Sequence, residues 1–258
     1  FKITPDQLAR AITPSTRWLL LNSPSNPSGA VYSAADLRAL GDVLSDHPKV
    51  WIASDEIYQN IAYVAAPSAR DVLPEFADRT VVINGVSKAY AMTGWRIGWA
   101  VAPAPVIAAM AVVQGQSTSG ASSISQAAAL AAVTGPQGFL ETRRAAFKAR
   151  RDLVISSISQ NPLLNCTAPE GAFYAFVSCG SALGLNTPDG SLIGDDAAFC
   201  RYVLNAQGLA VVPGRAFAMP GFFRLSYAYS EAELKDALGR LERATASLGP
   251  ASATDGKG

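Results

Sequence analysis

Three short apolar runs constrain the fold of this chain more than any other feature. They are Arg17–Asn22 (RWLLLN), Lys49–Ser54 (KVWIAS) and Arg79–Asn84 (RTVVIN). Such runs are typical of strands buried on both faces, as in a parallel sheet covered by helices. A helix is predicted between the first two, from Ser33 to His47, with Ser33 as N-cap and Asp36 at the capping-box position. The order strand, crossover, strand predicts an α/β fold.

The pattern changes twice further along the chain. Arg96–Ala102 (RIGWAVA) predicts a fourth strand, and helical patterns follow from about Val106 to about Gln160. Strands are then predicted at 171–177, 209–214 and 222–228, with helices at 195–208 and 230–248, which together form an α+β unit. We therefore expect a large domain over residues 1–146, a smaller C-terminal domain over 147–248 and a disordered tail over 249–258.

Composition excludes several classes of function. The chain has 258 residues, 16% of them charged, and a net charge of +1, which leaves no basic surface for nucleic acid or for an anionic membrane. No apolar run approaches the roughly 18 residues that cross a bilayer. Cys166, Cys179 and Cys200 are scattered, without a CxxC pair, and predict free thiols in a reducing cytoplasm rather than disulfides or a zinc site. We expect a cytoplasmic protein that binds no nucleic acid, membrane or metal.

Reactive side chains follow each of the three predicted strands. Asn26 comes after the first, Asp55 and Tyr58 after the second, and Lys88 after the third. Ligands bind outside the carboxyl ends of strands in an open α/β sheet, so we expect these four residues to meet at one edge. Each also has an ordinary structural interpretation, respectively a turn residue, a helix N-cap, a packing aromatic and a lysine with a buried stem. Their coincidence favours a binding site.

One chemistry needs all of these groups. His47, the only histidine, precedes a proline in a turn-like segment, so acid–base chemistry at neutral pH must come from other side chains or from a cofactor. A desolvated lysine amine has a lowered pKa and can attack an aldehyde. Arg96, between Trp95 and Trp99, would bind an anion, and a buried Asp55 needs a partner such as a protonated pyridine nitrogen. Pyridoxal 5′-phosphate has all three complementary groups.

Six segments resemble signature blocks of the fold-type I pyridoxal-phosphate aminotransferases of class I, most of all those of its bacterial aspartate/aromatic branch. They are SPSNPSGAVYS, SDEIYQNIAY, NGVSKAYAMTGWRIGWAVAP, PEGAFYAF, VVPGRAF and FRLSYAYSEAEL. The resemblance extends from Phe1 to Leu248 and implies a three-layer large domain with a mostly parallel sheet, incomplete here, plus a smaller α+β domain. Because the chain begins in the middle of a pattern, we expect the family's N-terminal part, with its glycine-rich phosphate loop and ring-stacking aromatic residue, to be absent.

The resemblance implies a role for each residue at the predicted edge. Lys88 would form the Schiff base with the cofactor and shuttle a proton to and from the substrate. Asp55 would pair with the pyridine nitrogen. Tyr58, one helical turn after Asp55, and Asn26 would hydrogen-bond the ring oxygen.

The same resemblance assigns anion-binding roles to further side chains. Arg96 would bind the cofactor phosphate. Gly85 stands where many relatives have a phosphate-binding serine, so Ser87 is the candidate replacement. Asn26 and Arg224 would bind the substrate carboxylate, Arg224 through a bidentate contact that suits a planar guanidinium.

The implied activity is transamination between an L-amino acid (aspartate, glutamate or an aromatic one) and a 2-oxo acid such as 2-oxoglutarate. The loop Gln116–Gln126 resembles a segment that borders the neighbouring subunit's site, so a homodimer is expected. Two alternatives stay open. One is another pyridoxal-phosphate reaction on the same fold, such as β-elimination from a sulfur amino acid (a C–S lyase), and the other is an aminotransferase-like effector domain of a transcription regulator.

Overall fold

The chain forms two compact units that are interleaved in sequence. The computed structural model describes residues 1–250, so the predicted tail lies outside the described residues from position 251 onward. Unit 1 comprises Phe1–Asn26, Ala30–Ala145 and Glu170–Ala172, and unit 2 comprises Pro27–Gly29, Ala146–Pro169 and Phe173 onward. Helix α6 (Gly138–Ser159) contributes residues to both units.

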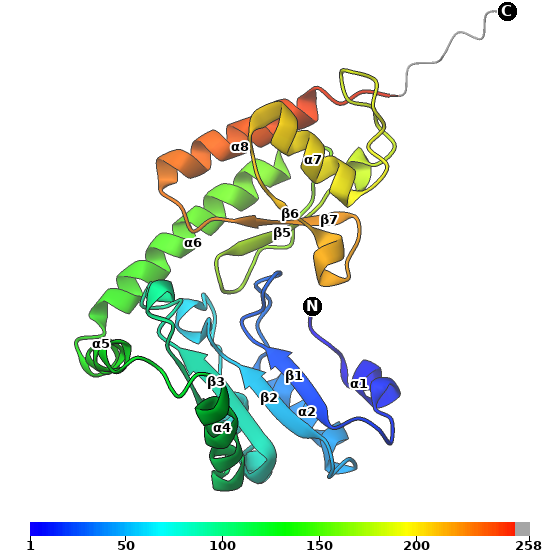
Figure 1. Cartoon of the computed structure of the whole chain (residues 1–258). Coiled ribbons are helices and arrows are strands. Elements are labelled where there is room, and N and C mark those ends of the chain that lie inside the picture. Colours follow the sequence, from blue (N-terminus) through cyan, green and yellow to red (C-terminus); the bar gives the residue numbers. More distant parts are fainter. Residues whose placement is uncertain (251–258) are drawn as a thin grey trace, which may run out of the picture. The chain divides into compact units, whose positions relative to one another are not determined.

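A four-stranded sheet of order β1-β2-β3-β4 forms the centre of unit 1 (Figure 1). Strands β1 (Trp18–Asn22), β2 (Trp51–Asp55) and β3 (Thr80–Gly85) are parallel neighbours. Strand β4 (Gly98–Val101) runs antiparallel to β3. The three apolar runs are therefore confirmed as parallel strands, and the fourth predicted strand is the antiparallel edge of the same sheet.

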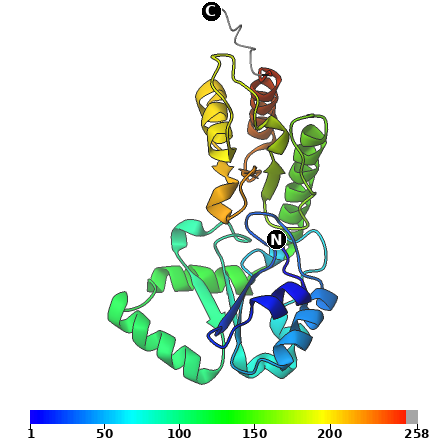
Figure 2. The same cartoon turned by 90° about the vertical axis from the view of Figure 1, so that its right-hand side faces the viewer.

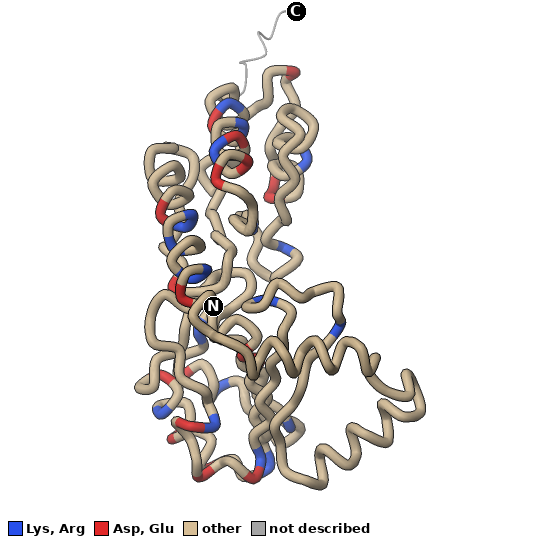
Figure 3. Tube along the Cα trace, turned by 90° about the vertical axis from the view of Figure 1, so that its left-hand side faces the viewer, with Lys and Arg blue, Asp and Glu red and all other residues tan. Residues whose placement is uncertain are grey.

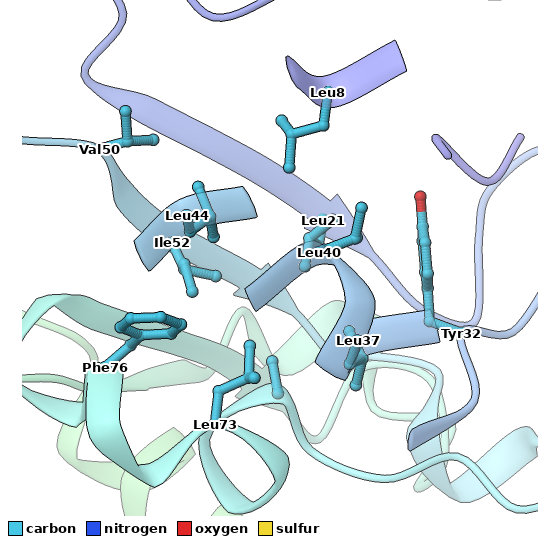
Figure 4. Close-up of a cluster of buried hydrophobic side chains, with 11 residues drawn as sticks. Leu8, Leu21, Tyr32, Leu37, Leu40, Leu44, Val50, Ile52, Leu73 and Phe76 are labelled. Carbon is cyan, nitrogen blue, oxygen red and sulfur yellow. The ribbon is translucent and has the colours of Figure 1, made fainter. Parts of the chain in front are cut away.

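Helix α2 (Ala34–Ser45) begins at the predicted cap and closes one side of this sheet. Ser33 Oγ accepts from Asp36 N at 3.1 Å, and the Asp36 carboxylate accepts from Ser33 N at 2.9 Å. The inward leucines of α2 pack against β1, β2 and α1 (Pro5–Ala11) in one buried cluster (Figure 4). Each fully buried leucine stabilises the fold by about 1.5–3 kcal/mol. The packing of α2 and α1 on this face of the sheet is therefore stabilised by residues of unit 1 itself.

The connection from β2 to β3 contains only short helices. They are η1 (Gln59–Ile61), α3 (Ala69–Val72) and η2 (Pro74–Arg79). The expectation that Tyr58 lies one helical turn after Asp55 is wrong, because residues 56–58 form a turn that leads into η1. Asp55 Oδ1 accepts from Ile57 N at 3.1 Å, so this carboxylate closes a turn two residues on instead of capping a helix.

Helices α4 (Ala104–Ser117) and α5 (Ser123–Thr134) lack both the charges and the packing of α2. The segment Ile97–Leu140 has no Asp, Glu, Lys or Arg and is an uninterrupted tan trace in Figure 3. Helix α4 has no buried residue, and Val113 and Ile124 are 69% and 72% exposed. These apolar side chains lack cover within the part of the chain that the structure describes. No helix there is long and apolar enough to cross a membrane.

Unit 2 is built on an antiparallel sheet of order β5-β7-β6. Its elements are β5 (Tyr174–Ser178), η4 (Gly180–Ala182), α7 (Asp196–Gln207), β6 (Val212–Pro213), η5 (Gly214–Phe217), β7 (Phe222–Ser226) and α8 (Glu231–Ala246). Figure 2 shows α7 in yellow and α8 in brown-red beside this sheet. Strand β6 is shorter than the predicted strand 209–214, because residues 209–211 lie outside the ladder with β7 and Gly214 begins η5.

A closed ion cluster ties the start of α7 to η5. The Asp196 side chain is 0% exposed and accepts from Arg215 N at 2.8 Å, Nε at 3.0 Å and Nη2 at 2.8 Å. Arg215 Nη2 also pairs with Asp195 at 2.8 Å. Asp195 Oδ1 in turn accepts from Ala198 N at 2.7 Å and caps α7. All charges of the cluster are thereby satisfied within unit 2.

Candidate active site

The carboxyl ends of β1, β2 and β3 share one edge of the sheet in unit 1. The parallel register places Asn22 beside Asp55 and Asp55 beside Ile83. Ser23 N donates to Asp55 O at 3.1 Å, which continues the ladder beyond the end of β1. The prediction that these strands end at one edge is confirmed, whereas the chemical roles of the side chains that follow them stay predictions.

Lys88 lies in a tight turn after β3. Ala91 N donates to Lys88 O at 3.1 Å, and Ala91 has a left-handed φ of 55°. The lysine is half-buried, and its Nζ lies 5.8 Å from the centroid of the Tyr58 ring. Within residues 1–250 the amine forms no hydrogen bond and no ion pair. An amine held in this way is available to a reacting group.

Residues at the start of α6 hold this turn. Arg143 Nη1 donates to Ala89 O at 3.0 Å, and Tyr90 Oη donates to Gln137 Oε1 at 2.8 Å. The Tyr90 ring also lies edge-on to Phe139, with 5.8 Å between centroids. These contacts join residues about 50 positions apart, so no local pattern could have predicted them.

Asp55 is a half-buried carboxylate beside the lysine. Burial raises the pKa of Asp55, while the hydrogen bond from Ile57 N and the positive charge of Lys88 oppose this shift in part. The two groups therefore lie within electrostatic range, but no ion pair joins them in the described part of the chain. A cation bound next to Asp55 would find a carboxylate with spare acceptor capacity.

Asn22 links the Asn26 segment to Asp55, although the sequence did not single it out. Asn26 N donates to Asn22 Oδ1 at 2.6 Å, and Asn22 Nδ2 donates to Asp55 O at 3.3 Å. Its position as the last residue of β1, beside the last residue of β2, was the only available signal. The predicted residue Asn26 is exposed at this edge.

Arg96 has an unusual backbone conformation for a non-glycine residue. It follows η3 (Thr93–Trp95) in the left-handed region with a φ of 56°. Its guanidinium donates to Thr93 O at 2.9 Å and is exposed. Such conformations cost on the order of 1–3 kcal/mol and persist where a site requires them. Within the described range Arg96 has no carboxylate partner, so it can receive an anion.

Arg224 belongs to unit 2 and lies in β7. Its guanidinium carbon is 4.5 Å from the centroid of the Tyr174 ring and 5.1 Å from that of Phe217. The register places Arg224 beside Phe176 on β5. The two rings orient the guanidinium and limit its rotation, which favours directional recognition of a carboxylate. The other predicted site residues, from Asn26 to Arg96, all belong to unit 1.

The three thiols offer no competing nucleophile. Burial raises the pKa of Cys166 and of Cys179 to about 11, and that of Cys200 to about 12. Almost no thiolate is present at neutral pH when the pKa is this high. Across residues 1–250, no group of three or more His, Cys, Asp and Glu side chains is placed to hold a metal ion.

Comparison with known families gives a match over nearly the whole chain. The model for aminotransferase class I and II matches residues 1–241. Among curated proteins, aspartate aminotransferase from Rhizobium meliloti (strain 1021) is 54% identical over 248 residues, which cover 95% of this chain and 60% of that protein. Aspartate/prephenate aminotransferase from Cereibacter sphaeroides is 47% identical, with 96% of this chain and 62% of that protein covered.

Solved structures show the same likeness. The crystal structure of the aspartate aminotransferase from Rhizobium meliloti matches with a TM-score of 0.93 and 53% identity, covering 96% of this chain and 62% of that one. The Thermus thermophilus aspartate aminotransferase with maleate matches with a TM-score of 0.83 and 40% identity, covering 94% and 60%. These matches confirm the predicted fold and the predicted resemblance. The chain spans about three fifths of the length of such relatives.

Proposed function

Because the chain belongs to the family of class I and II aminotransferases, we propose that its protein is a pyridoxal-phosphate-dependent enzyme that transfers an amino group between an L-amino acid and a 2-oxo acid. One observation supports this most strongly. Half-buried Lys88 lies in the turn after β3, close to Tyr58 and within electrostatic range of Asp55, and its amine has no ion-pair partner within residues 1–250. A structural lysine would be paired or solvated, whereas a covalent attachment site needs a free amine.

The residues of unit 1 fit this cofactor. Its aldehyde needs an amine, its pyridine nitrogen a carboxylate and its phosphate a cation, and Lys88, Asp55 and Arg96 supply them. A Cβ at Gly85 would lie 2.9 Å from Ile97 O and 3.0 Å from Gly98 Cα, so a serine there would displace β4. The phosphate contact that many relatives take from a serine at this position must come from other donors, and the Ser87 hydroxyl is the nearest along the chain.

Each residue has a defined task in this proposal. When bound, the cofactor supplies an electron sink for negative charge at the substrate Cα. Lys88 would hold the cofactor covalently and would move a proton to and from the substrate Cα. Asp55 would keep the pyridine nitrogen protonated. Tyr58 and Asn26 would donate hydrogen bonds to the ring oxygen.

The substrates follow from the carboxylate contacts and from the relatives. Arg224 would bind the α-carboxylate of the substrate, and Asn26 would add a second contact. We propose aspartate, glutamate or an aromatic amino acid as donor and 2-oxoglutarate as acceptor, because the similar proteins are aspartate and aspartate/prephenate aminotransferases. We also propose that the protein is a homodimer. A cytoplasmic location is proposed because all three cysteines are free thiols.

A two-substrate assay on the full-length protein tests the proposal. With added pyridoxal phosphate, aspartate and 2-oxoglutarate should give glutamate, and omission of either substrate should abolish the product. Release of pyruvate and ammonia from a single sulfur amino acid, without transfer, would instead show β-elimination. Absence of any cofactor uptake would reject both reactions and favour a regulatory domain.

A further inference from the structure

Glu56, directly after Asp55, is a second carboxylate with a different environment. It is 3% exposed, and no ion pair reaches it in the described part of the chain. Three donors converge on its Oε1: Ser54 Oγ at 2.9 Å, Ser68 Oγ at 2.9 Å and Ala69 N at 3.0 Å. Burial raises the pKa of Glu56, and these hydrogen bonds offset that shift in part. All three partners donate to this one oxygen, so they hold the carboxyl in a single orientation.

Asp55 and Glu56 point to opposite faces of the sheet. Side chains alternate along a strand, so Ser54 and Glu56 share one face and Asp55 faces the other. Glu56 N still donates to Ile83 O at 2.8 Å, so the ladder with β3 extends to this residue. Glu56 is therefore fixed to the sheet by its backbone and to α3 by its side chain.

The Glu56 side chain closes the loop that contains Tyr58. Ser68 is the N-cap residue of α3, yet its hydroxyl makes no capping bond to the helix and donates to Glu56 instead. Glu56 itself accepts from Ala69 N, the first N–H of α3. The loop 56–68 is thus joined at both ends by one carboxylate oxygen. Within it, Gln59 Nε2 donates to Ala66 O at 3.2 Å.

We propose that Glu56 is a positioning residue that holds the Asp55–Tyr58 turn in place from the face of the sheet opposite Lys88. This inference rests on the proposed function, since it assigns Asp55 and Tyr58 to the cofactor. Three hydrogen bonds to one buried oxygen restrain both ends of the loop, and they are stronger when the acceptor is ionised. Glu56 acts through its neighbours and touches no reacting group.

Four variants test this inference in the full-length protein. Glu56→Ala removes the acceptor, Glu56→Gln keeps the shape without the charge, and Ser68→Ala removes one donor while leaving Glu56 unchanged. Glu75→Gln is the matched control, because Glu75 is a carboxylate of the same unit whose ion pair with Arg38, at 2.7 Å, is exposed. Two readouts are measured: amide hydrogen exchange without cofactor, and the pH midpoint of the absorbance of bound pyridoxal phosphate.

The expected result is local and graded. In Ser68→Ala, amides of residues 57–68 should exchange about 10-fold faster, with larger increases in Glu56→Ala and intermediate ones in Glu56→Gln. The absorbance midpoint should shift by about 0.5 pH units or more in Glu56→Ala, because Asp55 and Tyr58 set the electrostatics at the ring. Glu75→Gln should change neither readout.

Two outcomes would overturn the proposal. One is exchange that rises equally throughout unit 1, because Glu56 would then contribute only to general stability. The other is an unchanged absorbance midpoint in Ser68→Ala and Glu56→Ala proteins that are folded and bind the cofactor. If the wild-type protein takes up no cofactor, the proposed function fails on its own, and the exchange measurement still decides whether Glu56 restrains the loop.

Discussion

Each unit has a carboxylate next to a cation: Asp196 with Arg215 in unit 2, and Asp55 with Lys88 in unit 1. Only the first two are joined by an ion pair. Asp196 accepts three hydrogen bonds from Arg215, and the same guanidinium binds Asp195. The Asp55 carboxylate accepts one hydrogen bond, from Ile57 N, and the Lys88 amine donates none within residues 1–250. The charges of the Asp196–Arg215 cluster are paired with one another, whereas Asp55 and Lys88 keep capacity for further partners.

The pKa directions of the two carboxylates differ for the same reason. Burial raises the pKa of Asp55, and its few partners do not reverse this. Burial would also raise the pKa of Asp196, but the side-chain and backbone hydrogen bonds from Arg215 outweigh it, and the net pKa lies below the ordinary value. For these two carboxyls the difference follows the hydrogen bonds: Asp55 keeps acceptor capacity for a ligand, whereas Asp196 is fully used in a structural contact with Arg215.

Replacement of Lys88 should have the largest effect. We expect Lys88→Ala to lower turnover by at least about 10⁴-fold, because both the attachment point and the proton carrier are lost. Borohydride should trap a cofactor adduct on residue 88 of the wild-type protein and none in the variant. Lys49→Ala is the matched control, since Lys49 is exposed and precedes β2 at the opposite end of that strand. Full turnover by Lys88→Ala would contradict the proposed function.

Replacement of Asp55 should separate activity from stability. In Asp55→Asn the amide oxygen can still accept from Ile57 N, but the negative charge is gone. We expect kcat/KM to fall by about 10²–10³-fold, the usual loss for one electrostatic contact in an active site. The free energy of unfolding of the cofactor-free protein should stay equal or increase, because the raised pKa shows that folding disfavours this charge. Urea unfolding and steady-state kinetics measure the two effects separately.

The strands of unit 1 were predictable because their signal is local. Apolar runs such as Arg79–Asn84 span only adjacent residues, and parallel pairing then follows from the order of the elements. The same reasoning placed Asn26, Asp55 and Lys88 after strands that share an edge. Capping of α2 by Ser33 was equally local and is confirmed.

Contacts between distant segments were not predictable. Glu56 meets Ser68 across a loop, and nothing in SDEIY shows which of its two carboxylates is enclosed. The two rings beside Arg224 come from β5 and η5, so their approach depends on how unit 2 folds. Tyr58 was placed on a helix because spacing alone does not distinguish a helical turn from the turn that Asp55 closes.

Replacement of Asp196 should have the reverse effect of replacement of Asp55. Asp196→Asn removes a charged acceptor from a fully buried position, at a cost of about 1.5–3 kcal/mol in the free energy of unfolding. The lower part of this range is expected, because the Arg215 side chain is 47% exposed and keeps Asp195 as a partner. Cofactor uptake by the folded protein should be unchanged. A loss of turnover without a loss of stability would show that the closed cluster is functional after all.

The smallest expected effect is the pH dependence of the difference in unfolding free energy between the wild-type protein and Asp196→Asn. A lowered folded-state pKa means that the unfolded chain binds the proton first as the pH falls. The stability due to Asp196 is therefore complete above its unfolded value of 3.8 and is lost as the pH falls through the lower folded value. Urea unfolding between about pH 6 and about pH 3 should show a wild-type advantage over Asp196→Asn that shrinks only at the acid end.

For Asp55→Asn the sign is opposite. Any gain in stability over wild type should grow as the pH rises through 3.8, because the charge that folding disfavours is then fully present in the unfolded state. If the stability difference from wild type changed with pH in the same direction for both variants, the two carboxylates would not differ in the way their hydrogen bonds indicate.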